Sequence, residues 1–559
     1  MTKPVLFIVA PDSHFLKVAA RHLNSEFGDR FQVYTADSGT NALEALNRLK
    51  QNHEPVALFL VEQQMPQIIG SDFLEQAIAL FPEAKRILLT DVKTDADIRK
   101  IETVNIDYYL LKLSDPPENR LYPTVQDLLD DWQAAFISPF EGIRVIGQRW
   151  SPQSHQIKNF LFRNQRPFTW LDIETDEEAN RLIDRLKSNH SGADEPQLPL
   201  IIFPDDSHLE APTLVQVAEK IGLSTHPKQT FYDLVIVGGG PAGLGAAVYG
   251  VSEGLNTIII EKIAPGGQAG TSSRIENYLG FPSGLSGADL ARRAIVQAQR
   301  FGVEILSPQE VTGIRIEDQK RFVTIADGTE IGCHALLIAI GVEWRKLDVP
   351  GVEQLTGRGV YYGAAMFEAM SCRNEDVYLV GGANSAGQAA MYFSKYDRNV
   401  TMLVRGDSLS KGMSQYLIEQ IEATENITVR LCSSIVEVKG ENHLEAIAIT
   451  NAETKETQIV PVTSLFLFIG ATPHTDWLAD VVKRDQRGFI LSGPELLHDG
   501  RYPPEWRLER DPFLFETSVP GIFVTGDVRQ KSVKRVASAV GQSAVVVQLI
   551  HQYLTHLQK

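Results

Sequence analysis

The stretch Asp233-Leu-Val-Ile-Val-Gly238-Gly239-Gly240-Pro241-Ala242-Gly243 decides the fold of the largest part of the chain. An apolar run leads directly into a G-x-G-x-x-G pattern, an alanine-rich helical stretch follows, and the next apolar run, from Thr257, ends at Glu261. The glycines permit a tight turn and the close approach of a diphosphate to a helix N-terminus, and the acid can accept from a ribose hydroxyl. The pattern therefore predicts a Rossmann-type dinucleotide site.

A distant segment near the C-terminus complements this site. The run Gly521-Ile-Phe-Val-Thr-Gly526-Asp527 is typical of a strand that ends in an acid, and the residues from Lys534 to Ala537 open an apolar helix. Together, the two segments imply an FAD site.

A second nucleotide signature lies between these two segments. The run Asp376-Val-Tyr-Leu-Val-Gly381-Gly382-Ala383-Asn384-Ser385-Ala386-Gly387 again predicts a strand, a glycine-rich turn and a helix. One dinucleotide domain is therefore expected to be inserted in another.

Composition narrows the functional classes. The chain has 559 residues, of which 43% are hydrophobic, and this size and composition predict several packed α/β domains. With 53 basic and 70 acidic residues the net charge is -17, which disfavours nucleic acid as a partner. The apolar run Val5 to Ala10 is too short for a membrane span, so we expect a cytoplasmic protein.

The cysteines are few and widely separated. Cys333, Cys372 and Cys432 form neither a C-x-x-C pair nor a zinc-binding pattern, and the histidines show no metal-ligand spacing. Redox chemistry must therefore use a bound cofactor, and no metal is expected.

The first 115 or so residues alternate apolar runs with amphipathic stretches, which predicts a doubly wound parallel sheet. This pattern resembles a response-regulator receiver domain, in which an acid pair after the first strand holds magnesium and an aspartate takes a phosphoryl group. Here the acid pair is replaced by Ala10-Pro11 with Asp12 beyond, and the acceptor aspartate by Glu62. Without these ligands magnesium would be poorly held, which indicates a pseudo-receiver.

The receiver's switch positions are retained as Thr90 and Lys112. Two interpretations of Glu62 stay open. It could pair permanently with Lys112 and hold one signalling state, or the two could form an ordinary ion pair in a packing domain.

A second small unit is expected from about 140 to 225, and its element order resembles a thioredoxin or glutaredoxin fold. The Cys-x-x-Cys of that family is replaced by Ser151-Pro152-Gln153-Ser154, while Leu198-Pro199 fits the family's cis proline. Serine cannot carry out thiol exchange, and Ser-Pro is a favourable helix start. We interpret the unit as a docking or dimerisation element.

The region from about 231 to 559 resembles the pyridine nucleotide-disulfide oxidoreductases, and specifically the low-molecular-weight thioredoxin reductases. The resemblance extends to Gly266-Gly267-Gln268, Ile275-Glu-Asn277-Tyr278, Ala339-Ile340-Gly341 and Gly357-Arg-Gly-Val360. The resemblance and the signatures imply FAD contacts from Gly238, Gly240, Pro241, Ala242, Gly243, Glu261, Lys262, Gly267, Gln268, Asn277, Ala339, Gly341, Gly526, Asp527, Arg535, Val536 and Ala537.

The chain departs from this family at the redox-active dithiol. Thioredoxin reductases have Cys-x-x-Cys just after the Gly-Arg-Gly-Val motif, and this chain has Gly363, Ala364, Ala365 and Met366. Cys372 alone cannot form the intramolecular disulfide that accepts electrons from flavin. Electrons would leave directly, to a small molecule, to a metal or flavin centre on a partner, or to a partner's disulfide.

The leading hypothesis is therefore an FAD enzyme that takes hydride from NAD(P)H at the flavin and passes electrons to an unidentified non-disulfide acceptor. One rival is an enzyme of the ferredoxin-NADP reductase type, since that branch also lacks the dithiol. Another is a flavin-holding redox sensor or scaffold. The layout as a whole resembles fused response-regulator and thioredoxin-reductase-like proteins of bacteria, and a homodimer is expected by analogy.

The nicotinamide nucleotide site also departs from the family. Its expected residues are Gly381, Gly382, Ala383, Asn384, Ser385, Ala386, Arg405 and Lys411. Ala383 replaces the middle glycine, which weakens the approach of a diphosphate. Of the family's His-Arg-Arg cluster for the 2′-phosphate, Arg405 is retained, so NADPH is favoured over NADH, although Arg405 could be a solvated loop charge.

These motifs predict a succession of domains. They are a pseudo-receiver (1–118), a linker with a cysteine-free thioredoxin-like domain (119–228), a first part of an FAD domain (229–347), an NAD(P)H domain (348–469) and a second part of the FAD domain (470–559).

Overall fold

The computed structural model describes residues 3–52, 54–90, 106–111, 121–135, 142–189, 196–272, 274–281, 284–363, 372–504 and 506–557. Two compact units are present, Met1–Glu141 and Gly142–Lys559.

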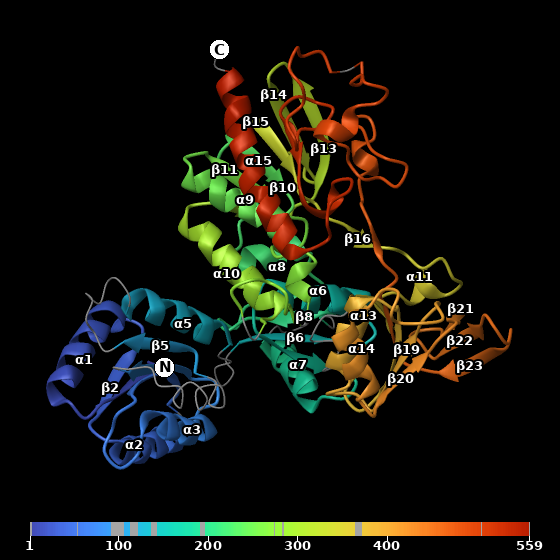
Figure 1. Ribbon diagram of the computed structural model, residues 1–559. Helices are drawn as coiled ribbons and strands as arrows, with labels where there is room; N and C mark the ends of the chain where they lie inside the picture. The colour runs from blue at the N-terminus through green and yellow to red at the C-terminus, as the bar shows by residue number, and fades with distance from the viewer. Residues whose placement is uncertain are drawn as a thin grey trace. The chain divides into compact units, whose positions relative to one another are not determined.

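The first unit is a parallel five-stranded sheet in the order β2-β1-β3-β4-β5 (Figure 1). This is the flavodoxin-like doubly wound order, and the central strands β1 and β3 are buried throughout and apolar except for Glu62 because helices cover both faces. The strands are β1 (Val5–Val9), β2 (Gln32–Ala36), β3 (Val56–Glu62), β4 (Lys85–Thr90) and β5 (Tyr108–Leu111), and the helices are α1 (Ser13–Phe27), α2 (Gly39–Gln51), α3 (Gly70–Leu80) and α5 (Leu121–Ala135).

Helix α5 corrects the expected boundary at residue 118. Its side chains Leu121, Val125, Leu129 and Trp132 recur at helical spacing and are buried with α1 against the first sheet. The first unit therefore continues to Glu141. The proline pair that suggested a linker lies outside the described residues.

The second unit begins with residues 142–228, which we call the 142–228 module. Its four-stranded sheet has the order β7-β6-β8-β9. Strands β6 and β7 pair in parallel, β8 pairs antiparallel with β6, and β9 pairs antiparallel with β8. As predicted, the Leu198–Pro199 peptide is cis, and the Ser151 side chain caps the helix that Pro152 opens. The elements are β6 (Ile143–Gly147), α6 (Pro152–Arg163), β7 (Phe168–Asp172), α7 (Glu177–Asn189), β8 (Leu200–Ile202), β9 (His208–Glu210) and α8 (Leu214–Lys220).

The sheet that carries the first signature has the order β12-β11-β10-β15-β14-β13. Strand β26 (Ile522–Val524), from the distant C-terminal segment, pairs with β15 in parallel. Its other strands are β10 (Phe231–Val237), β11 (Thr257–Ile260), β12 (Glu304–Leu306), β13 (Val311–Glu317), β14 (Lys320–Ile325) and β15 (Glu330–Ile338).

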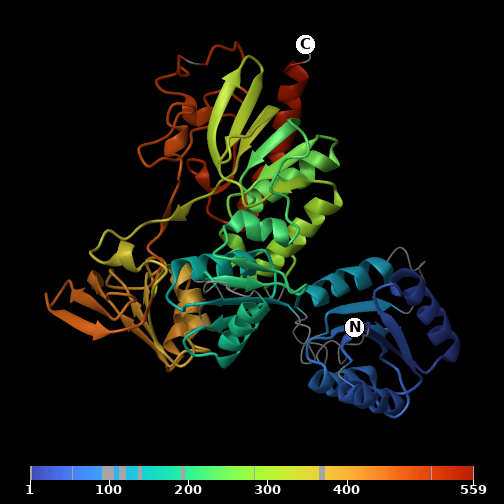
Figure 2. The same ribbon diagram turned by 180° about the vertical axis from the view of Figure 1, so that it is seen from behind.

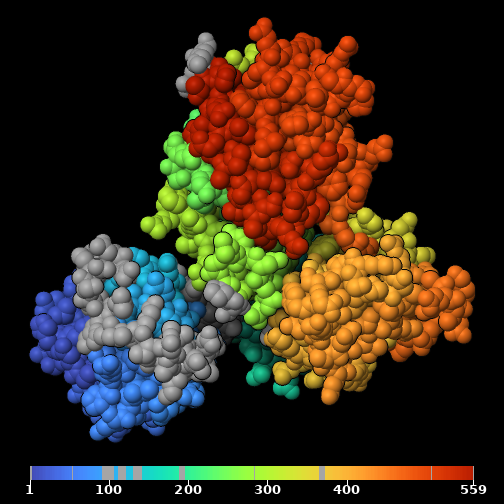
Figure 3. All heavy atoms as spheres, viewed as in Figure 1, coloured from blue at the N-terminus to red at the C-terminus, as the bar shows by residue number. Residues whose placement is uncertain are grey.

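Three helices accompany this sheet: α9 (Pro241–Ser252), α10 (Gly287–Arg300) and α15 (Val536–Leu557). Helices α9 and α15 lie side by side in both views (Figures 1 and 2) and bury Ala246, Val546 and Ile550 in one core. In Figure 3 the C-terminal segment, orange to red, forms most of the visible surface of this domain. The two distant segments thus build one domain.

The second signature lies in a parallel sheet of order β17-β24-β18-β19-β20, beside a three-stranded antiparallel sheet β21-β22-β23. The chain enters and leaves this domain through the antiparallel pair β16 (Glu343–Trp344) and β25 (Ala471–Thr472), so the domain is inserted as predicted. Its elements are α11 (Val352–Leu355), β17 (Val360–Tyr362), β18 (Asp376–Val380), α13 (Asn384–Phe393), β19 (Asn399–Leu403), α14 (Gln415–Glu422), β20 (Ile427–Arg430), β21 (Ser433–Lys439), β22 (Ala446–Asn451), β23 (Thr457–Pro461) and β24 (Ser464–Leu467).

Candidate nucleotide and redox site

The glycine-rich turn after β10 leaves open space at the N-terminus of α9. Gly238 has φ +106°, and a Cβ there would lie 2.5 Å from the Ala339 carbonyl oxygen. A Cβ on Gly243 would lie 1.9 Å from the Gly238 oxygen, so this glycine permits the close strand-helix packing. Gly240, the N-cap of α9, has only Gly267 Cα near its Cβ position, at 3.8 Å. The free helix N-terminus and this space fit a diphosphate.

Glu261 is fixed beside this turn by two backbone donors. Its Oε2 accepts from Gly239 N at 2.7 Å, and its Oε1 accepts from Ile263 N at 3.0 Å. Each carboxylate oxygen has a further lone pair, so Glu261 can still accept from a ribose hydroxyl. The orientation that such a contact needs is already set.

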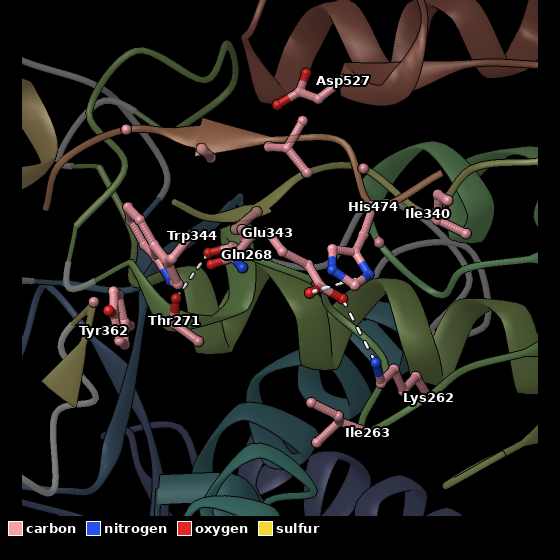
Figure 4. Close-up of a pocket in the computed structure, with 18 of the residues that line it drawn as sticks. Lys262, Ile263, Gln268, Thr271, Ile340, Glu343, Trp344, Tyr362, His474 and Asp527 are labelled. Atoms are coloured by element: carbon pink, nitrogen blue, oxygen red, sulfur yellow. Dashed lines mark hydrogen bonds and ion pairs between the residues drawn. The ribbon is translucent and has the colours of Figure 1, made fainter. Parts of the chain in front are cut away.

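The loop that begins at Ala264 lies on the glycine-rich turn. Gly266 N donates to Gly239 O at 2.8 Å, and Gly266 and Gly267 have φ +109° and +57°. Thr271 Oγ1 donates to Gln268 O at 2.9 Å, which closes the loop beside the cavity (Figure 4). Glycine is required at Gly267 because a Cβ there would lie 2.9 Å from Gly240 Cα.

A cavity of about 1900 Å³ connects these features. It exceeds the usual volume of a site for one small ligand, roughly 300–1,000 Å³, so it has room for a dinucleotide and part of a second ligand. The residues expected at an FAD site that line it are Gly238, Gly240, Pro241, Ala242, Glu261, Lys262, Gly267, Gln268, Ala339, Gly341, Gly526, Asp527, Arg535 and Val536.

Three expected FAD residues are not among the cavity-lining residues. Gly243 is packed behind the turn, Asn277 is exposed, and Ala537 belongs to the first turn of α15. For Gly243 the physical reason is that its role is close helix-strand packing rather than ligand contact.

Asp527 and Lys534 line the cavity on the side formed by the C-terminal segment. Burial raises the pKa of Asp527, and the charge of Lys534 counteracts that shift. Burial lowers the pKa of Lys534, whose Nζ donates to the Asp527 carbonyl at 2.8 Å. The Gln542 side chain of α15 accepts from Gly526 N at 2.9 Å. Figure 4 shows Asp527 across the cavity from Lys262.

A charged cluster that includes Lys262, across the cavity from Asp527, was not predicted from the sequence. Lys262 Nζ lies 2.9 Å from Glu310 Oε1 and 3.7 Å from Glu343 Oε1, and His474 Nδ1 lies 3.9 Å from Glu343 Oε2 (Figure 4). Burial alone would lower the pKa of Lys262, but the two glutamates raise it by more. These residues come from separate segments, so no local sequence motif reveals the cluster.

The inserted domain reaches the same cavity through α13. Ser385, Gln388 and Tyr392 line it, together with Trp344 and Tyr362. Gln388, Tyr392, Trp344 and Tyr362 were missed because each stands outside the glycine signature. Figure 4 shows Trp344 and Tyr362 near Thr271, so groups from both dinucleotide domains meet at this end of the cavity.

The other expected nicotinamide-nucleotide residues surround the turn after β18 and do not line the cavity. Gly381 has φ +150°, and a Cβ there would lie 2.6 Å from the Phe468 oxygen. Gly382, Ala383, Asn384 and Ala386 complete the turn and the start of α13, where Ala383 is the N-cap. The Asn384 amide donates to Ser414 Oγ at 3.1 Å and accepts from Ser414 N at 2.7 Å, which ties the turn to the loop before α14.

The two expected cations of this site differ in their surroundings. Arg405 is exposed just after β19 and has no ion pair among the described residues. Lys411 Nζ lies 2.6 Å from Asp407 Oδ1. Arg405 is therefore the better placed of the two for an anionic ligand.

The buried thiols are poor nucleophiles. Cys372 Sγ donates to Ser464 Oγ at 3.2 Å, and burial raises its pKa to about 12. Burial in β15 likewise raises the pKa of Cys333 to about 12. Because the thiolate is the reactive form, neither is suited to disulfide exchange near neutral pH.

The segment that follows the Gly-Arg-Gly-Val motif is partly described. Gly363 lines the cavity with φ +75°, and a Cβ there would lie 2.9 Å from Trp344 Nε1. Ala364, Ala365 and Met366 lie outside the described residues, as does Lys112 of the first unit. The described residues contain no group of three or more His, Cys, Asp or Glu side chains that could hold a metal. No helix in the described ranges is long and apolar enough to cross a membrane.

Comparison with known proteins places these features in a family. The model of the family described as "Pyridine nucleotide-disulphide oxidoreductase" matches residues 232–543, and the chain belongs to this family. It is 33% identical to a thioredoxin reductase of Treponema pallidum over 330 residues, covering 59% of this chain and 99% of the relative. It is 30% identical to the "34.2 kDa protein in rubredoxin operon" of Clostridium pasteurianum over 322 residues, covering 58% and 97%.

Solved structures agree. A Lactococcus lactis thioredoxin reductase, in the conformation named FR, is 29% identical and superimposes with a TM-score of 0.51 over 58% of this chain and 99% of its own. The chain is thus an NAD(P)H-dependent flavoprotein oxidoreductase, and the cofactors of its family are FAD and NADPH. The open N-terminus of α9, Glu261 and the shared cavity fit FAD.

Proposed function

We propose that this protein is an FAD-dependent NAD(P)H oxidoreductase that passes electrons from the flavin directly to a non-disulfide acceptor. The observation that carries the proposal is one continuous cavity lined by both dinucleotide domains, combined with a sequence that has no Cys-x-x-Cys pair. Cys372, six residues beyond Met366, is buried and hydrogen-bonded to Ser464.

The chain's own residues would bind and orient the cofactor. The N-terminus of α9, opened by Gly240, would bind the diphosphate, and Glu261 would orient a ribose through its hydroxyls. Bound FAD would supply the two-electron chemistry that couples oxidation of NAD(P)H to reduction of an acceptor. Trp344 and Tyr362 line the cavity at the junction of the two domains (Figure 4) and would place aromatic rings beside the bound cofactors.

NADPH is the proposed donor. The exposed guanidinium of Arg405 stands after β19, beside the turn that Gly381 opens, and an arginine fork matches a 2′-phosphate. Ala383 has φ -113°, an extended conformation that its side chain adopts without strain, so the methyl weakens nucleotide binding without preventing the turn.

The other parts of the chain are proposed to be non-catalytic. In the first unit Asp12 accepts from His14 N and Phe15 N as the N-cap of α1, so this acid has a structural role. Glu62 ends β3 and is 5% exposed, in the place of a receiver's phosphoryl acceptor. We further propose that the first unit is a pseudo-receiver and that the 142–228 module is thioredoxin-like. We also propose that the protein is a homodimer in a reducing compartment.

Acceptor specificity tests the proposal. NADPH oxidation should be measured with a quinone, ferricyanide, a flavoprotein partner or thioredoxin disulfide as acceptor, in the parent protein and in Cys372→Ser. We expect turnover with at least one non-disulfide acceptor, unchanged by Cys372→Ser because that buried thiol takes no part. Efficient thioredoxin reduction would overturn the proposal. If none of these acceptors supports NADPH oxidation, the sensor interpretation is favoured.

A further inference from the structure

Helix α6 of the 142–228 module forms part of the wall of the flavin cavity. His155, Asn159 and Arg163 recur every fourth residue, so they share one face of the helix, and all three line the cavity. The apolar residues Ile157, Phe160 and Leu161 are buried in the core of the module. This polar face is therefore turned to the candidate cofactor site, although the family match begins only at residue 232.

Arg163 is the cation of this face. Its Nη2 donates to the carbonyl oxygens of Ala264 and Gly267 at 3.5 and 3.4 Å, and its other N–H groups have no hydrogen-bond partner among the described residues. Gly267 in turn touches Gly240 at the N-terminus of α9. The guanidinium thus lies on the loop that packs against the diphosphate cradle.

Arg163 is a partly buried cation with no ion-pair partner among the described residues. Burial lowers its pKa, and the carboxylate of Glu261 raises it. Glu261 acts on the guanidinium only through its charge, since no ion pair within 4.0 Å joins the two side chains among the described residues. A partly buried arginine with spare donors is stabilised by an anion, and its planar donors match phosphate oxygens.

We propose that Arg163, from the 142–228 module, is a further FAD-binding residue that donates to the anionic ADP half of the cofactor. This inference rests on the proposed function, because it requires that the cavity holds FAD. It changes the role of the module: its helix α6 completes the cofactor site instead of serving only to dock a partner.

The test is the affinity of the full-length apoprotein for FAD, measured by flavin fluorescence. Arg163→Gln should raise the dissociation constant about ten- to a hundredfold, because a charge-assisted contact to phosphate is lost. The matched control is Arg166→Gln, since Arg166 Nη2 also donates to a backbone carbonyl, Ile221 O at 3.1 Å, but lies outside the cavity lining. This control should retain the parent affinity within about twofold.

Folding is monitored separately by thermal unfolding of the apoproteins. We expect Arg163→Gln to unfold near the parent temperature and to gain less stability from added FAD. If that variant does not fold, Arg163→Met, which preserves the apolar stem, replaces it in the same titration. NADPH affinity should be unchanged in either variant, because the second nucleotide turn is built from the inserted domain.

If Arg163→Gln binds FAD as tightly as the parent protein, this inference is overturned and the proposed function is not affected. A Gly240→Val variant serves as the positive control for a lost FAD site, because a side chain there would enter the space beside α9. If the parent protein itself neither contains nor binds FAD, the proposed function fails as well. The two failures are therefore distinguishable.

Discussion

At the scale of single residues, Arg405 is predicted to set the nucleotide preference. Arg405→Ala should raise the dissociation constant for NADPH by about ten- to a hundredfold, because a charge-assisted contact to the 2′-phosphate is lost, and should change that for NADH little. Titration of each nucleotide against protein fluorescence measures both constants. Lys411→Ala is the control. We expect it to have a smaller effect because Lys411 is paired with Asp407. Equal losses for NADPH and NADH would refute this role.

Asp397 is predicted to make stability depend on pH. The residue is 6% exposed, and its carboxylate has no hydrogen-bond partner among the described residues. Burial, helped by the charge of Glu375, raises the pKa of Asp397 from 3.8 to about 7. The folded state keeps this proton to higher pH than the unfolded state, so stability falls as pH rises from about 4 to 7.

Asp397→Asn should therefore raise the unfolding temperature more at pH 8 than at pH 5. Thermal unfolding at the two pH values measures this difference, and Asp480→Asn, at an exposed aspartate, is the control. A stabilisation by Asp397→Asn that is the same at both pH values would show that burial of the charge is not its cause.

Residues that belong to a local motif, at the glycine-rich turn or at a strand end, could be predicted from the sequence. The expected residues that stand in these motifs line the cavity: Gly238, Gly240, Pro241, Ala242, Glu261 and Asp527. Glu343, His474 and Arg163 could not be predicted, since their proximity depends on how separate segments pack. Their residue types carry no spacing signal.

At the scale of secondary-structure elements, strand β3 leads to a prediction about the first unit. It ends in buried Glu62 where a receiver has its acceptor aspartate, and Ala10-Pro11 offer no carboxylate for magnesium. We expect no phosphoryl group on this unit after treatment with acetyl phosphate and magnesium, as measured by intact-protein mass spectrometry. Glu62→Asp tests whether the lost acceptor alone explains this. A phosphorylated parent protein would contradict the pseudo-receiver proposal.

Helices α5 and α6 show why elements can be predicted more readily than their packing. The sequence predicts α6, since Ser151 and Pro152 form a strong helix start, and the structure confirms this cap. The sequence does not reveal that its polar face lines a cavity, because polar residues at that spacing are equally typical of a solvated face. Helix α5 was missed because a nearby proline pair suggested a linker.

At the scale of the whole molecule, the order of the signatures along the chain predicted the insertion of one dinucleotide domain in another. Parallel pairing of β26 with β15 is the physical consequence, since the C-terminal strand must complete a sheet begun by β10. The 142–228 module contacts both dinucleotide domains: Arg149 Nη2 lies 2.6 Å from Glu375 Oε1, and Arg163 contacts the loop at Gly267. These contacts join side chains far apart in sequence, which no local pattern predicts.

The stoichiometry of reduction tests the central claim most directly. A flavin and a dithiol-disulfide pair are each two-electron couples, so a conventional member with both would take up about four electrons per FAD. This chain should take up about two. Anaerobic titration of the FAD-loaded protein with NADPH, followed at the flavin absorbance band, is expected to end near one NADPH per FAD. An end point near two NADPH per FAD, or no bleaching by NADPH, would contradict an NADPH-reducible flavin that acts without an internal dithiol.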